Sequence, residues 1–237
     1  MIPGEAHRDM VLSEADEGAY LEATLAIGNN KLAAYQRALT GIRAVERDKA
    51  PMKPEDPFIL RDIATVLVDC GLRPEECSRL RWEHVRDGAV HIPFGKTESA
   101  RRTIPLTQRA AALIEMRRAA ARSSEWVFPA ETQSGHIEKS SLKKQHSNAC
   151  KLAKLAPFPF YTFRHTCLTR WAVYMDPYTL AYLAGHSDFS ITRRYVHPQV
   201  QTIRDALERA RKGQGGHSSG HNCAAPIETS TILRAVS

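Results

Sequence analysis

The chain of 237 residues has little of what marks secreted, membrane-spanning or metal-binding proteins. Its five cysteines are scattered, odd in number and form no CxxC pair: Cys70, Cys77, Cys150, Cys167 and Cys223. This pattern indicates reduced thiols rather than a disulfide framework or a zinc site. The first residues lack the basic and apolar regions of a signal peptide. No apolar run approaches the roughly 18 residues that a membrane-spanning helix needs. We therefore expect a soluble, cytoplasmic protein that holds no metal and no cofactor.

What is present is an ordinary globular composition with a basic bias. Hydrophobic residues make up 43% of the chain and charged residues 25%, which suffices for one good core. The formal net charge is +7 and the sequence pI is about 9.3, which favours an anionic partner. An excess of this size is compatible with nucleic acid but does not establish it.

The hydrophobic periodicity predicts a mainly helical α+β domain with a small antiparallel sheet. Helices are expected from Ser13 onward and, approximately, over residues 31–47, 58–70, 107–122, 140–155, 162–174, 177–184 and 199–211. Gly71 and Gly185 are predicted helix stops, and Pro74 suits a helix start. Two β-like runs, residues 89–94 and 102–106, are joined by a polar loop and predict a hairpin.

Three segments combine the residue types that phosphodiester cleavage without a metal requires. Such a reaction needs a nucleophile, cations for the charge that develops at phosphorus, and a proton donor for the leaving oxygen. The planar fork of arginine holds two phosphate oxygens and keeps its charge. The segments are Gly71-Leu72-Arg73-Pro74-Glu75-Glu76, Tyr161-Thr162-Phe163-Arg164-His165-Thr166 and Leu183-Ala184-Gly185-His186-Ser187-Asp188, the last followed by Tyr195 nine residues after its histidine.

In order and spacing, these segments resemble the three signature motifs of tyrosine recombinases, the phage integrase family. The resemblance implies a DNA breaking–rejoining catalytic domain over residues 9–212, with a mechanism like that of type IB topoisomerases that needs neither metal nor ATP. Residues 29–57, or about that range, are expected to be an insertion, and the family's N-terminal core-binding domain is expected to be missing. The Gly-, Ser- and His-rich residues 213–237 are expected to be a disordered tail.

Carried over by position, the resemblance implies a role for each catalytic residue. Arg73 and Arg164 clamp the scissile phosphate, and His186 adds a hydrogen bond or acts as acid or base. Lys96, in the predicted hairpin loop, protonates the leaving 5′ oxygen. Tyr195 attacks the phosphate and holds a 3′-phosphotyrosyl bond until another strand's 5′ hydroxyl reverses the reaction.

Three further residues are expected to support the site. Glu76 matches the family's acidic position and is expected to orient the arginine and histidine side chains, and His165 is expected to be structural. Tyr161 departs from the pattern, because the family usually has histidine or lysine at this position. A phenol donates hydrogen bonds, but with a pKa near 10 it carries protons poorly at neutral pH. Tyr161 is also a rival nucleophile to Tyr195.

A basic helix lies between the second strand and the second motif. Its exposed lysines are Lys143, Lys144, Lys151 and Lys154. Two interpretations are equally open: a solvated face, or a surface that follows the DNA backbone with salt-dependent affinity.

The resemblance favours a site-specific recombinase or integrase of a mobile element, which acts on double-stranded DNA as a homotetramer in the nucleoid. A relaxing type IB topoisomerase is the alternative within the same chemistry, since it needs no protein tetramer. A non-catalytic DNA-binding remnant is the alternative from another class. The complete residue set argues against a remnant, whereas the short N-terminal part argues for it.

Overall fold

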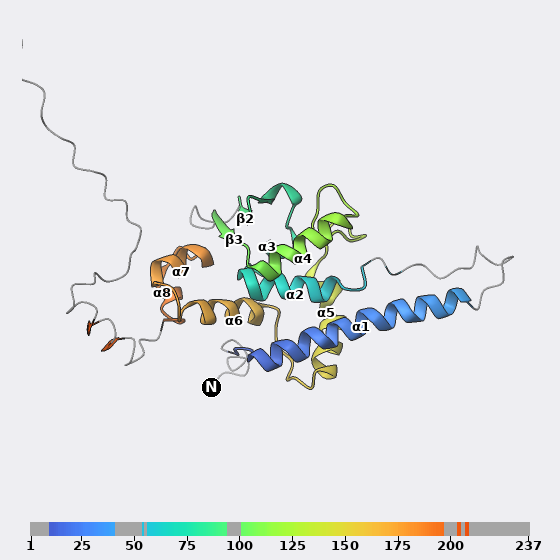
Figure 1. The fold of residues 1–237 in the computed structure, drawn as a ribbon, viewed down its shortest axis with the longest axis horizontal. Coiled ribbons are helices and arrows are strands. Elements are labelled where there is room, and N and C mark those ends of the chain that lie inside the picture. Colours follow the sequence, from blue (N-terminus) through green and yellow to red (C-terminus); the bar gives the residue numbers. More distant parts are fainter. Residues whose placement is uncertain are drawn as a thin grey trace, which may run out of the picture. The chain divides into compact units, whose positions relative to one another are not determined.

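The structure is a computed structural model that describes residues 10–40, 54, 56–93, 101–196, 203–204 and 207–208. Its helices and strands are, in chain order, α1 (Glu14–Thr40), α2 (Ile59–Cys70), α3 (Pro74–Ser78), a 3₁₀ turn (Trp82–His84), β1 (Val85–Arg86), β2 (Ala89–Ile92), β3 (Arg102–Pro105), α4 (Gln108–Ala119), α5 (Lys139–Leu152), α6 (Tyr161–Trp171), α7 (Pro177–Ala184) and α8 (Phe189–Thr192). These elements belong to one unit of the chain, Met1–Val196, and confirm the mainly helical α+β fold (Figure 1).

Helix α2 is the centre of this unit. All of its residues except Arg61 and Asp69 are buried, and it contacts α1, α3, α4, α5 and α6 (Figure 1). A helix that is buried on almost every side lies inside a core rather than on its surface, and its polar side chains need partners there. The helix ends as predicted at Gly71, whose left-handed φ of 59° lets its N–H donate to the carbonyl of Leu67.

The prediction of a break between two N-terminal helices is wrong, because α1 continues without interruption from Glu14 to Thr40. The helix begins as expected after Ser13, whose hydroxyl accepts a hydrogen bond from the backbone of Asp16. Gly28 and its neighbours are weak helix formers, but each costs only about 1 kcal/mol or less. Packing offsets this cost: Gly28 is buried against Phe58, and the Lys31 ammonium donates to Gln145 of α5.

The predicted hairpin is confirmed, and the structure adds a third strand to it. The sheet has the order β1-β2-β3, and Val90 of β2 lies opposite Val85 on one side and Ile104 on the other. Asp87 and Gly88 both have positive φ, as a tight turn between β1 and β2 requires. The two-residue strand β1 is too short to leave a period in the sequence.

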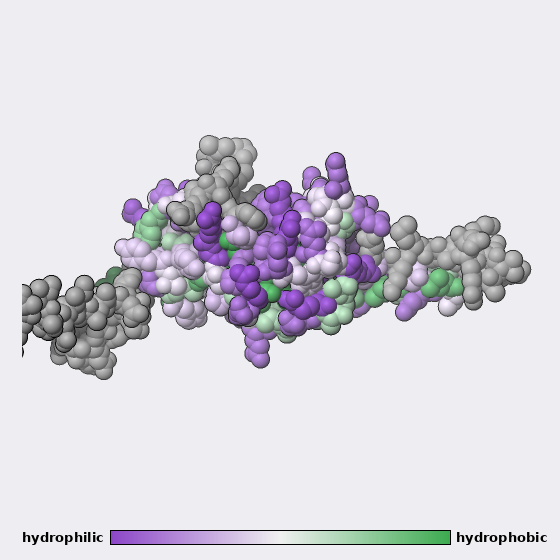
Figure 2. All heavy atoms as spheres, turned by 90° about the horizontal axis from the view of Figure 1, so that it is seen from above, coloured by the Kyte–Doolittle hydropathy of each residue, from purple (hydrophilic) through white to green (hydrophobic). Residues whose placement is uncertain are grey.

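On the face shown in Figure 2, the described residues are mainly hydrophilic, with small hydrophobic areas between them. Among the described residues, no helix combines the length and the apolar character needed to cross a membrane.

Helix α7 is short and closely defined at both ends. Asp176 caps its start by accepting hydrogen bonds from the backbone of Tyr178 and Thr179. Its predicted end at Gly185 is confirmed, with a left-handed φ of 63°. A Cβ atom at Gly185 would also lie 2.8 Å from a guanidinium nitrogen of Arg102. Glycine is therefore required here for two independent reasons, backbone conformation and side-chain packing.

We expect Gly185→Ala to destabilise the fold more than Gly88→Ala, a matched change at another glycine with positive φ. Gly88 has a φ of 67° and open space around its missing side chain, so alanine there costs only backbone strain, roughly 1 kcal/mol. Gly185→Ala adds a collision with Arg102. Urea denaturation of both variants measures the difference, and equal losses would show that Arg102 does not constrain this position.

Candidate active site

Three arginines from three different elements converge on the C-terminal end of α7. Each donates to one of three successive backbone carbonyls: Arg102 Nε to Leu183 O (2.8 Å), Arg164 Nη2 to Ala184 O (2.5 Å) and Arg73 Nη2 to Gly185 O (2.7 Å). The last carbonyls of a helix lack partners within the helix and carry partial negative charge, so cations are stabilised there. The end of α7 therefore gathers residues that are far apart in the sequence.

Glu76 joins two of these arginines. Its Oε1 accepts from Arg73 Nη1 at 2.8 Å and from Arg102 Nη1 at 3.0 Å. Its Oε2 accepts from the backbone N–H of Arg73 at 2.8 Å and from Arg102 Nη2 at 2.7 Å. Burial raises the pKa of this carboxyl, but its bonds to Arg102 and Arg73 outweigh burial and lower the pKa to about 2. Glu76 is therefore ionised at neutral pH and holds Arg73 in a fixed direction.

Arg164 lies on the first turn of α6 and is completely buried. Besides its bond to α7, its Nη1 donates to the carbonyl of Gly71 at 2.5 Å. Burial lowers the pKa of this guanidinium from its usual value, although arginine stays protonated in proteins. The side chain thus joins the end of α2 to the end of α7.

His186 follows directly on Gly185 and faces Arg164. Its Nε2 lies 3.3 Å from Arg164 Nη2, and its Nδ1 lies 2.9 Å from the hydroxyl of Thr192. Burial, together with the charges of Arg164, Arg73 and Arg102, lowers the pKa of His186 to about 4. The imidazole is therefore neutral at pH 7. A guanidinium only donates, so Nε2 accepts from Arg164 and Nδ1 carries the proton.

Tyr195 lies beside this histidine. Its side chain is buried in a small cluster with Leu168 of α6 and with Leu180 and Ala184 of α7. Its ring stacks on that of His186, with the centroids 6.1 Å apart. The segment between them, which contains α8, therefore places the ring of the predicted nucleophile against that of the predicted histidine.

The phenol of Tyr195 is protonated at neutral pH. Burial raises its pKa to about 12, Tyr161 adds to this, and the charge of Arg164 opposes it. Tyr161, the first residue of α6, is 44% exposed, whereas Tyr195 is 8% exposed. The His165 and Tyr195 rings are in contact, with their centroids 5.1 Å apart.

The structure thus brings Arg73, Glu76, Arg164, His165, His186 and Tyr195 to one place and adds Arg102, which the motif analysis missed. The alternation of β3 carried a signal for it, because Arg102 and Ile104 lie on one face of the strand and both are buried. Lys96 lies outside the described residues. The four lysines on and after α5 are exposed, which is compatible both with a solvated face and with a surface that follows the DNA backbone.

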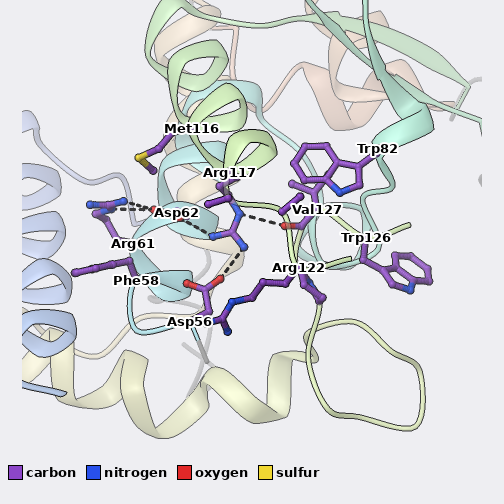
Figure 3. Close-up of a pocket in the computed structure, with 13 residues that line it drawn as sticks. Asp56, Phe58, Arg61, Asp62, Trp82, Met116, Arg117, Arg122, Trp126 and Val127 are labelled. Carbon is purple, nitrogen blue, oxygen red and sulfur yellow. Dashed lines mark hydrogen bonds and ion pairs between the residues drawn. The ribbon is translucent and has the colours of Figure 1, made fainter. Parts of the chain in front are cut away.

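A separate cavity of about 350 Å³ lies between α2 and α4, and shares no residue with the arginine cluster (Figure 3). Its central side chain, Arg117, is bound to Asp56 and to Asp62, each at 2.7 Å. Arg117 and the two carboxylates compensate one another within the wall, and Arg122 also lines the cavity. Within the described parts of the chain, no group of three or more His, Cys, Asp or Glu side chains is placed to hold a metal ion.

Comparison with known proteins identifies the family of the chain. The model of the Phage integrase family matches residues 48–217. The chain belongs to this family. A putative integrase/recombinase of Haemophilus influenzae is 28% identical over 153 residues, which cover 62% of this chain and 48% of that protein. Tyrosine recombinase XerD of Pseudomonas aeruginosa is 32% identical over 180 residues, which cover 70% of this chain and 59% of XerD.

Solved structures show the same fold for this phage integrase family member. The Tn1549 transposon integrase in complex with circular intermediate DNA has a TM-score of 0.60 and 18% identity, covering 85% of this chain and 67% of that one. The catalytic domain of bacteriophage HP1 integrase has a TM-score of 0.50 and 19% identity, covering 85% and 93%. The chain has the fold of a tyrosine recombinase catalytic domain and spans about half the length of the curated relatives it matches.

We expect Glu76 to make the folding stability of this integrase family member fall as the pH is lowered through the acidic range. The pKa of Glu76 is about 2 in the folded chain against 4.5 ordinarily. Its contribution, roughly 3 kcal/mol, is therefore fully present above pH 4.5 and is lost as the pH falls towards 2. Glu76→Gln removes this dependence, whereas Glu75→Gln, a neighbouring exposed control, keeps it. Urea denaturation between pH 7 and pH 3 makes the comparison. Parallel pH profiles for wild type and Glu76→Gln would contradict the ion-pair assignment.

Proposed function

We propose that this phage integrase family member is a site-specific DNA recombinase that cleaves and rejoins strands through a 3′-phosphotyrosyl intermediate on Tyr195. One observation carries the proposal: the phenol of Tyr195 lies against His186, beside a cluster of arginines held on the end of α7. A nucleophile, a hydrogen-bonding imidazole and phosphate-binding cations are thereby within one site.

The arginines suit a phosphate rather than a neutral substrate. Arg73, Arg102 and Arg164 together with Glu76 have a net charge of +2. The Nε of Arg164 has no hydrogen-bond acceptor in the described part of the chain, and a donor of this kind gains by meeting an anion. A phosphodiester carries one negative charge. Attack by a phenolate brings the total on the oxygens around phosphorus to about two negative charges.

In the cleavage step, Tyr195 Oη forms a bond to phosphorus while the bond from phosphorus to the 5′ oxygen breaks. The phenol passes its proton to the neutral imidazole of His186, and the 5′ oxygen gains one from Lys96, which occupies the family's position for this acid. A phosphate bound to the arginines adds negative charge beside His186 and so raises its pKa from about 4. The histidine becomes a better base when substrate is present. Attack by another 5′ hydroxyl reverses the step, so neither ATP nor metal is required.

Double-stranded DNA is the proposed partner, bound by a homotetramer. The Tn1549 integrase is described in complex with circular intermediate DNA, and XerH with its difH substrate. The exposed Lys143, Lys144, Lys151 and Lys154 add positive charge on a different part of this chain. They are proposed to follow the DNA backbone, where lysines contribute affinity without sequence preference.

We expect covalent capture of DNA by the full chain to depend on Tyr195. The probe is a library of nicked suicide duplexes with a randomised core, in which cleavage releases a short fragment and traps the enzyme on DNA. Wild type forms a denaturant-resistant adduct, Tyr195→Phe forms none, and Tyr161→Phe forms it more slowly, because it loses only a neighbouring hydroxyl. Sequencing the trapped duplexes identifies the preferred site.

Other outcomes of the same experiment decide between alternatives. DNA binding without any adduct from the library overturns the proposal and favours a non-catalytic DNA-binding protein. If the adduct is lost in Tyr161→Phe and retained in Tyr195→Phe, the nucleophile is Tyr161 and the proposed assignment is wrong. Adducts without sequence preference, with relaxation of supercoiled plasmid, indicate a type IB topoisomerase-like activity.

A further inference from the structure

Each of the three guanidinium nitrogens of Arg102 donates a hydrogen bond to an acceptor in the protein. Arg102 is the first residue of β3, and its side chain is completely shielded from solvent. Its Nε donates to Leu183 O, and its two Nη atoms donate to the two oxygens of Glu76. A buried arginine that holds a carboxylate with both arms of its fork is rigidly placed. These donors face protein acceptors, so Arg102 acts on a substrate only through its neighbours.

We propose that Arg102 is a positioning residue for strand cleavage, which balances the charge of Glu76 so that Arg73 and Arg164 keep theirs for the phosphate. The inference rests on the proposed function and assigns a role within the same site. The inference concerns charge, and the test has to separate it from the support that Arg102 also gives to the backbone.

The charge argument follows from the contacts of Glu76. Arg73 pairs with one carboxylate oxygen at 2.8 Å, and Arg102 pairs with the other at 2.7 Å. Without Arg102, Arg73 would be the one ion-pair partner that the described residues leave to a carboxylate whose side chain is only 14% exposed. A one-to-one pair of Arg73 and Glu76 has no net charge, and so it attracts a phosphate only weakly. With Arg102 in place, Glu76 fixes the direction of Arg73 without neutralising it.

The geometric argument concerns the end of α7. Arg102 packs so closely on Gly185 that a Cβ atom there would lie 2.8 Å from its Nη1. It also holds the carbonyl of Leu183, two residues before Gly185. Arg73 is bound to the carbonyl of Gly185, and His186 follows at once. Arg102 thus fixes the backbone from which two of the proposed catalytic side chains are aimed.

A double-variant cycle separates charge balance from mere support of the fold. The proteins are the full chain as wild type, Arg102→Gln, Glu76→Gln and the double variant. The rate of adduct formation is measured in single turnover with the suicide duplex most enriched by wild type. DNA affinity and thermal stability are measured for each protein. Arg117→Gln is the matched control, since the Arg117 side chain is only 10% exposed and bridges two carboxylates, Asp56 and Asp62, away from the site.

We expect Arg102→Gln to slow cleavage by about 10- to 100-fold, the usual range for a supporting residue, with a much smaller change in DNA affinity. In the Glu76→Gln background, where there is no charge to balance, Arg102→Gln should slow cleavage less than about 3-fold. Arg117→Gln should lower thermal stability and leave the cleavage rate of the folded protein unchanged.

An undiminished cleavage rate in Arg102→Gln overturns the inference. An equally large loss of rate in the wild-type and Glu76→Gln backgrounds also overturns it, because it would indicate support of the fold alone. If Arg102→Gln does not fold, the double variant compared with Glu76→Gln still decides, because two amides replace the ion pair and can bond to each other. A wild type that forms no adduct refutes the proposed function itself, which is a different result from an active wild type insensitive to Arg102.

Discussion

The site depends on one physical constraint, the need of the last carbonyls of α7 for partners. A helix end leaves these groups unpaired, and here three consecutive ones each receive an arginine from α6, β3 or the start of α3. The favourable interaction of cations with the negative end of a helix makes this end a natural place to hold three guanidinium groups together. Charges that would repel one another elsewhere are stabilised here, with Glu76 between two of them.

The same cluster sets the protonation states around it. It lowers the pKa of Glu76 to about 2 and contributes, with burial, to a pKa of about 4 for His186. Burial raises the pKa of Tyr195 to about 12. In the DNA-free protein the carboxylate is charged, while the histidine and tyrosine are neutral. Under the proposed function, binding of an anionic phosphate changes this balance and so couples the chemistry of the site to its substrate.

Much of the site could be predicted because its residues lie in short motifs at helix ends. Arg73 directly precedes one helix, Arg164 lies on the first turn of another and Gly185 ends a third, as the sequence indicated. Arg102 escaped prediction because it lies on a strand, where its role depends on a partner 26 residues away. The continuity of α1 escaped for a related reason: a local pattern of weak helix formers does not reveal the packing that overrides it. Tertiary contacts, not local sequence, decide such cases.

The identity of the nucleophile is the central claim, and mapping the covalent bond tests it most directly. The trapped complex is digested with nuclease and trypsin, and the peptide that retains nucleotide is sequenced by mass spectrometry. The account predicts nucleotide on the peptide that begins at Tyr195, after cleavage at Arg194. Nucleotide on the peptide that contains Tyr161, or on a residue outside the cluster, would contradict it.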